Sequence, residues 1–210
     1  MKKHVWTQVY KPYVGLHTFT ILPIVLRPRS RGWIRLETAD PYAQPLIEPN
    51  IFDSDQDLNV LVEGMKLALK VAKTPALRAY NAQPFQTTFP GCEGLELYSE
   101  PYLRCMARVY TITSWHPSGT CKMGFKTDPS AVVDPMGRVF GVRGLRVVDA
   151  SVMPNVVSGN TNAPTIMLAE KMADHVKGRR LKPFVPPMTR AMIARLPYMP
   201  YEDWHFSLLY

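Results

Sequence analysis

The sequence predicts an α+β fold in which an antiparallel sheet packs against helices. Of its 210 residues, 46% are hydrophobic and 20% are charged, a balance typical of a globular protein that buries a sizeable core. Residues 17–26 and 33–37 are rich in strand-forming residues, and residues 55–73 repeat apolar side chains at helical spacing. These patterns indicate a fold that combines strands with helices.

The first strands are expected within residues 17–26, His-Thr-Phe-Thr-Ile-Leu-Pro-Ile-Val-Leu, as one strand or two. Pro23 has no N–H to donate, so this segment is expected at a sheet edge or a bulge. After a turn at residues 27–32, residues 33–37 predict a short, partly buried strand.

The clearest helix is predicted for residues 55–73, which have one apolar face. Asp53 or Ser54 can cap its N-terminus, and Asp55 and Asp57 lie near the positive end of the helix dipole. Pro75 ends or kinks it. Its apolar side chains are expected in the core rather than in a functional site; they are Leu58, Leu61, Val62, Met65, Leu69 and Ala72.

The middle of the chain is expected to be irregular over residues 79–100, with a short helix within residues 101–115. Aromatic side chains of the irregular stretch can line a substrate cavity, but ordinary loop packing is the favoured interpretation. Cys92 and Cys105 can form a disulfide if the protein is secreted. Three free thiols, with Cys121 as the third, are equally compatible with the sequence.

Towards the C-terminus, residues 132–142 predict a β-hairpin, and Leu145–Val148 a short strand that stops at Asp149. The last helix is expected from about Pro164 to Val176, because proline suits the first helical position and Gly178 can cap the end. The proline-rich residues 179–210 are expected to be extended and poorly tied down unless a partner covers them.

A histidine loop runs from Ser114 to Gly124, Ser-Trp-His-Pro-Ser-Gly-Thr-Cys-Lys-Met-Gly. Histidine has an unperturbed pKa of about 6.5, so His116 is a candidate for proton transfer near neutral pH. Pro117 biases His116 towards extended backbone, and Gly119 and Gly124 permit positive φ or close backbone approach. These features suit a proton-transfer site, and an ordinary structural loop can share them.

This loop and two later motifs resemble the C-terminal region of the glucose-methanol-choline (GMC) oxidoreductases. The later motifs are Gly-Leu-Arg-Val-Val-Asp-Ala-Ser-Val-Met-Pro at 144–154 and Ser-Gly-Asn-Thr-Asn-Ala-Pro-Thr-Ile-Met-Leu-Ala-Glu-Lys at 158–171. A weaker signal is Leu-Arg-Pro-Arg-Ser-Arg-Gly at 26–32. The insect glucose dehydrogenase-like branch is the most similar, and the resemblance covers about residues 15–178.

The resemblance implies FAD-dependent oxidation of a CH–OH group in a small-molecule alcohol or sugar. Residues 1–130 would form the substrate-binding part, and residues 131–178 a hairpin, strand and helix that complete an FAD-binding domain. The family's Gly-x-Gly-x-x-Gly turn is absent from this sequence, so a missing N-terminal FAD-binding segment is expected to supply it. The alternative is a non-catalytic fragment or binding module that folds without flavin.

The resemblance also assigns roles to single residues. His116 matches the family's base, and Asn162 matches the second member of its catalytic pair, with Asn160 as the alternative in so short a motif. From the residues alone, either asparagine can instead cap the following helix, and Asp149 can simply end a strand in a turn. The expected FAD-binding positions, at the flavin edge, the flavin ring and the ribityl–pyrophosphate region, are Trp115, Asn160, Thr161, Asp149 and Ala150.

Other classes of function are disfavoured. The net charge of +8 is scattered and accompanies no nucleic-acid-binding motif. His116 and Cys121 have no further ligands at metal-binding spacing, and the Gly-x-Ser-x-Gly motif of serine hydrolases is absent. The apolar residues 19–26 are too few to cross a bilayer, and the first residues do not resemble a signal peptide. Localisation stays open, and would be extracellular if a longer chain carries a signal peptide.

Overall fold

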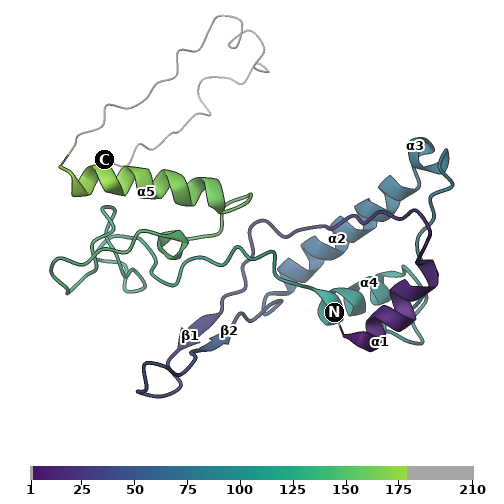
Figure 1. Ribbon diagram of the computed structural model, residues 1–210, viewed down its shortest axis with the longest axis horizontal. Coiled ribbons are helices and arrows are strands. Elements are labelled where there is room, and N and C mark those ends of the chain that lie inside the picture. Colours follow the sequence, from purple (N-terminus) through teal and green to yellow (C-terminus); the bar gives the residue numbers. More distant parts are fainter. Residues whose placement is uncertain (1, 179–210) are drawn as a thin grey trace, which may run out of the picture. The chain divides into compact units, whose positions relative to one another are not determined.

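The computed structural model describes residues 2–178 (Figure 1), and the predicted tail at 179–210 lies outside this range. Within the described range, residues 2–172 form one compact unit, and the contacts reported below lie within it. No helix in the described range is both long and apolar enough to span a bilayer.

The elements are α1 (Lys3–Val5), η1 (Trp6–Tyr10), η2 (Lys11–Tyr13), β1 (Trp33–Arg35), β2 (Leu46–Glu48), α2 (Asp55–Ala72), α3 (Pro75–Arg78), α4 (Glu100–Tyr110), η3 (Ala150–Val152) and α5 (Asn162–Val176).

Helices α2 and α4 pack together around the main hydrophobic core (Figure 1). The apolar face predicted for α2 is confirmed, because Leu58, Val62 and Met65 are buried against α4. Helix α4 contributes Tyr102 and Leu103, and its first turn is capped by a serine side chain. These helices and an antiparallel strand pair make the α+β class that the sequence predicts.

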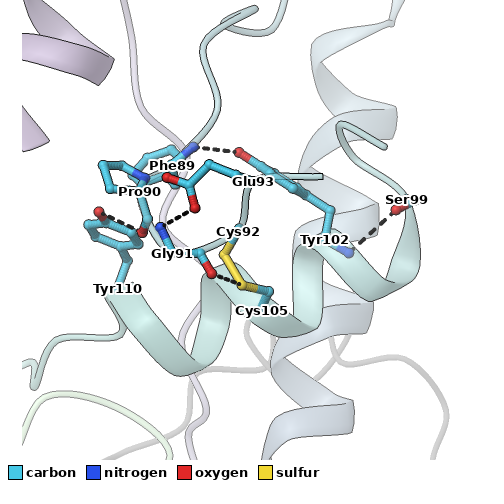
Figure 2. Close-up of a disulfide and its surroundings, with 9 residues drawn as sticks. All are labelled: Phe89, Pro90, Gly91, Cys92, Glu93, Ser99, Tyr102, Cys105 and Tyr110. Carbon is cyan, nitrogen blue, oxygen red and sulfur yellow. Dashed lines mark hydrogen bonds between the residues drawn. A yellow bond between two sulfur atoms is a disulfide. The ribbon is translucent and has the colours of Figure 1, made fainter. Parts of the chain in front are cut away.

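A disulfide joins Cys92 in the preceding loop to Cys105 on α4 (Figure 2). Of the two interpretations open from the sequence, the structure therefore contains the bridge, and Cys121 is the free thiol. Figure 2 shows hydrogen bonds that hold the same loop: the Phe89 N–H donates to the Tyr102 hydroxyl over 3.1 Å. The Gly91 N–H donates to a carboxylate oxygen of Glu93 over 2.8 Å.

The predicted strands at residues 17–26 are wrong, since this segment is extended but unpaired in the structure. A strand needs backbone partners, and the part of the chain that the structure describes offers it none. Leu22 and Ile24 are consequently 68% and 58% exposed. The strand predicted at residues 33–37 is confirmed in shorter form as β1, which pairs antiparallel with β2 in a register that places Ile34 opposite Ile47. All of its residues are exposed rather than partly buried, because no other helix or strand within residues 2–178 packs closely on this pair.

The predicted hairpin at residues 132–142 is confirmed as antiparallel bridging between Val133 and Val139. The strand predicted at residues 145–148 is reduced to a single bridge, between Arg138 and Arg146. Helix α5 begins two residues before Pro164, which its N-terminus tolerates because the first four helical N–H groups have no intrahelical partner. Its end is followed by Gly178 with φ of +68°, in agreement with the predicted C-cap.

Candidate active site

His116 contacts Thr161 at the start of α5. The His116 Nδ1 lies 3.0 Å from the Thr161 hydroxyl oxygen, and Thr161 is buried. The Thr161 carbonyl accepts hydrogen bonds from the Thr165 N–H over 3.0 Å and from the Thr165 hydroxyl over 2.6 Å, so the first turn of α5 fixes its position. One imidazole nitrogen is therefore held by a residue of fixed position, and Nε2 is left for another partner.

The histidine loop runs alongside η3. The Cys121 N–H donates to the Ser151 carbonyl and the Met123 N–H to the Val152 carbonyl, both over 2.9 Å. Gly119 has φ of +90°, and a Cβ at this position would lie 3.3 Å from the Met153 carbonyl oxygen. The close approach expected of this glycine is confirmed. These contacts bring the motifs at residues 114–124 and 144–154 together.

Trp115 adopts φ of +60° and is 76% exposed. A bulky residue in the left-handed region is rare, and such a conformation costs on the order of 1–3 kcal/mol unless its surroundings impose it. The Trp115 N–H donates to the Thr113 hydroxyl over 3.1 Å, which supports this turn. Strained backbone of this kind concentrates at functional sites, and here it stands next to His116.

The remaining candidates lie on either side of these contacts. Asp149 accepts hydrogen bonds from the Ser151 N–H, over 2.7 Å, and from the Ser151 hydroxyl, so its carboxylate caps η3, which begins at Ala150. Asn160 and Asn162 are exposed and flank Thr161, and Asn162 is the first residue of α5. Within residues 2–178 neither carboxamide has a hydrogen-bond partner, so both are available to a ligand.

Lys122 has a structural role that the sequence alone did not suggest. Its ammonium group donates to the Asp128 carboxylate over 2.7 Å and to the Ser130 hydroxyl over 2.8 Å. Its carbonyl accepts a hydrogen bond from the Val132 N–H over 2.8 Å. The ammonium of Lys122 and the hydroxyl and N–H of Ser130 together lower the pKa of Asp128 from 3.8 to about 2. This cluster folds the chain directly after the histidine loop.

We expect Asp128→Asn to lower the melting temperature at pH 6, and the difference from the wild type to vanish as the pH falls from about 4 to about 2. A carboxylate whose pKa is depressed on folding stabilises the protein above its unfolded pKa, and this contribution is lost as the pH falls through its folded pKa. Thermal unfolding followed by circular dichroism between pH 2 and 6 measures it. Asp53→Asn is the matched control, because the Asp53 carboxylate has no partner within residues 2–178. A difference that persists undiminished at pH 2 would contradict the assignment.

No group of three or more His, Cys, Asp or Glu side chains in the described range is arranged to hold a metal ion. What the structure brings together here is the His116 imidazole and the buried Thr161 hydroxyl. The exposed Trp115 indole and the exposed carboxamides of residues 160 and 162 are the sequence neighbours of these two residues. This set suits proton transfer and hydrogen bonding to a polar organic ligand.

The family model for the C-terminal domain of the GMC oxidoreductases matches residues 28–169. The chain belongs to the GMC oxidoreductase family. It is 46% identical over 153 residues to a glucose dehydrogenase [FAD, quinone] of Drosophila melanogaster, covering 73% of this chain and 24% of that protein. It is 42% identical over 154 residues to a human mitochondrial choline dehydrogenase, covering 73% of this chain and 25% of that protein. The chain thus spans about a quarter of the length of these GMC relatives.

Solved structures of GMC oxidoreductases agree with this fold. A formate oxidase of Aspergillus oryzae superposes with a TM-score of 0.62 at 28% identity, covering 73% of this chain and 26% of that chain. A fungal aryl-alcohol oxidase superposes with a TM-score of 0.61 at 32% identity, covering 71% and 24%. The glucose dehydrogenase-like resemblance inferred from the motifs is thereby confirmed.

Proposed function

We propose that this chain is the C-terminal part of an FAD-dependent oxidoreductase that oxidises CH–OH groups of small alcohols or sugars. The observation that carries the proposal is the His116–Thr161 contact at the start of α5, 3.0 Å between the ring nitrogen and the hydroxyl. The names of the relatives support the cofactor and the substrate class, since they include a glucose dehydrogenase [FAD, quinone] and a choline dehydrogenase.

His116 serves as the base in this proposal. The Thr161 hydroxyl holds Nδ1, so Nε2 takes the proton from the substrate hydroxyl. The carboxamide of Asn162, or of Asn160 in the alternative register, orients the same hydroxyl oxygen by hydrogen bonding without itself titrating. FAD, when bound, supplies the acceptor for the hydride that leaves the carbinol carbon.

The residues at the start of α5 fit a flavin. The first N–H groups of a helix have no intrahelical partner and carry partial positive charge, which suits an electron-rich ring. The free carboxamides of Asn160 and Asn162 add donors beside them, and the exposed indole of Trp115 offers a flat apolar surface. In this proposal Thr161 contacts the ring through its backbone, and the segment at Asp149 and Ala150 lies along the ribityl and pyrophosphate groups.

A further FAD-binding segment completes the site in this proposal. Residues 1–130 form its substrate-binding part, and residues 131–178 join the FAD-binding domain. Exposed apolar side chains in the unpaired segment 17–26 support a contact with this further segment, because large apolar patches on a protein surface usually mark a contact with another segment or partner. The side chains with the largest exposed fractions are Leu22, Ile24 and Phe19.

The same exposed surface favours the second candidate function, a binding module without catalysis. The two are separated by anaerobic mixing of alcohols and sugars with the flavin-loaded holoprotein, which is the complex of this chain with the further FAD-binding segment. The enzyme proposal predicts loss of the oxidised-flavin absorbance with a CH–OH donor and no change with its methyl ether, which has no hydroxyl proton to remove. A flavin that no CH–OH donor reduces would overturn the enzyme proposal and leave the binding module.

A further inference from the structure

A buried carboxylate fixes the turn before β1. Asp57, in the first turn of α2, is 4% exposed. It accepts hydrogen bonds from the Arg29 N–H over 2.8 Å, the Ser30 N–H over 2.8 Å and the Ser30 hydroxyl over 2.6 Å. Burial alone would raise the pKa of Asp57, but these hydrogen bonds outweigh it and lower the pKa below 3.8. The backbone of residues 29–30 is therefore anchored to α2.

The next residues are held equally firmly. The Arg31 carbonyl accepts a hydrogen bond from the Asn50 side chain over 2.9 Å. A Cβ on Gly32 would lie 2.2 Å from the Glu48 carbonyl oxygen, so the backbone passes directly against the end of β2. The backbone of Arg31 is thus fixed on both sides, and this limits where its side chain can lie.

The Arg31 guanidinium connects this anchored turn to the loop before α5. Its Nη1 donates to the Pro28 carbonyl over 2.8 Å and to the Ser30 carbonyl over 3.0 Å, which orients the planar group. Its Nη2 donates to the Asn155 side-chain oxygen over 2.7 Å, across 124 residues of sequence. A guanidinium can make these bonds at once because its donors form a rigid fork, which the single ammonium of lysine does not offer.

The loop at residues 154–160 has little else to hold it. Within residues 2–178, its other hydrogen bond is a local one, from the Gly159 N–H to the Val157 carbonyl over 2.8 Å. The loop leads directly into Thr161, which contacts His116. Arg31 is therefore placed to set the position of the residues that contact the histidine.

We propose that Arg31 is a positioning residue that acts through Asn155 to hold the loop at residues 154–160, and with it the His116–Thr161 contact. The role in catalysis rests on the proposed function, whereas the role in holding the loop does not. Asp57, Arg31 and Asn155 then form a continuous support from α2 to the candidate active site.

Hydrogen–deuterium exchange of the 210-residue protein tests the support directly. In Arg31→Met and Asn155→Leu, we expect the hydrogen-bonded amides of Gly159 and Thr165 to exchange roughly two- to tenfold faster, as for loss of one exposed hydrogen bond. Asn155→Asp keeps the acceptor oxygen and should exchange like the wild type. Arg29→Met is the matched control, because the Arg29 side chain has no hydrogen bond within residues 2–178. Unchanged exchange in the first two variants would overturn the proposal, and so would equal acceleration throughout α2, which would mark general loss of the fold.

Turnover of the flavin-loaded holoenzyme tests the role in catalysis. We expect Arg31→Met and Asn155→Leu each to lower kcat about tenfold, and the double variant to lose no more than either alone, because both remove one interaction. Asn155→Asp keeps the acceptor oxygen and should therefore have the kcat of the wild type. Additive losses would contradict a role through Asn155. A wild-type protein that oxidises no alcohol would contradict the proposed function, while the exchange pattern would still decide whether Arg31 holds the loop.

Discussion

Replacing His116 with alanine is expected to lower kcat for alcohol oxidation by roughly 10²–10⁴-fold, the usual contribution of a positioned general base. The hydroxyl proton then has no acceptor held by Thr161 at the start of α5, although the rest of the proposed site is intact. Anaerobic stopped-flow measurement of flavin reduction in the holoprotein gives the rate of the chemical step. Flavin content, measured from the same absorbance spectrum, should be unchanged.

His4→Ala is the matched control, because His4 is exposed and lies in α1. It should leave the rate of flavin reduction within about twofold of the wild type, as is usual for a surface substitution away from the chemistry. A His116→Ala protein that reduces its flavin as fast as the His4→Ala protein would rule out His116 as the base.

Removal of the Cys92–Cys105 disulfide is expected to lower the free energy of unfolding by about 3 kcal/mol. The bridge closes a short loop, since the two cysteines are 13 residues apart in the sequence. It also holds the buried Cys92 against the α2–α4 core. Urea unfolding of Cys92→Ala/Cys105→Ala against the oxidised wild type, both without reductant, measures the difference.

Cys121→Ala provides the control for this measurement, because Cys121 is free and only partly buried. It should shift the unfolding free energy by less than about 1 kcal/mol, and reductant should shift the wild type towards the disulfide variant. Mass spectrometry that finds Cys92 and Cys105 unlinked in the oxidised protein, or equal unfolding midpoints for wild type and double variant, would show that the bridge does not stabilise the fold.

Local patterns in the sequence were sufficient to predict the helices α2, α4 and α5. The apolar residues of α2 recur at helical spacing because that face is buried against α4, and the ends of the helix agree with the prediction to within a residue. The unpaired segment 17–26 was predicted wrongly because pairing depends on distant residues, whereas strand propensity is local. The N-terminal helices escaped prediction for a similar reason: they are held by long-range aromatic contacts, such as Tyr13 stacked on Phe85 with ring centroids 3.9 Å apart.

At the candidate site, the motifs allowed the residues to be named but not their contacts. The link between His116 and Thr161 joins residues 45 apart, and that between Arg31 and Asn155 joins residues 124 apart. Nothing in the local sequence marks either pair. For Thr161, the sequence suggested a backbone contact to the flavin, while the structure gives its hydroxyl a further role towards the histidine.

Flavin retention tests the central claim most directly, namely that this chain completes an FAD site together with a further segment of the family. The chain would be co-expressed with the part of the Drosophila melanogaster glucose dehydrogenase that lies outside the matched stretch, then desalted, and its absorbance spectrum recorded. We predict a complex that keeps its flavin bands, whereas the chain alone, after incubation with FAD, is colourless. A colourless complex would contradict the claim that this chain completes a flavin site, and flavin bands in the chain alone would contradict its need for the further segment.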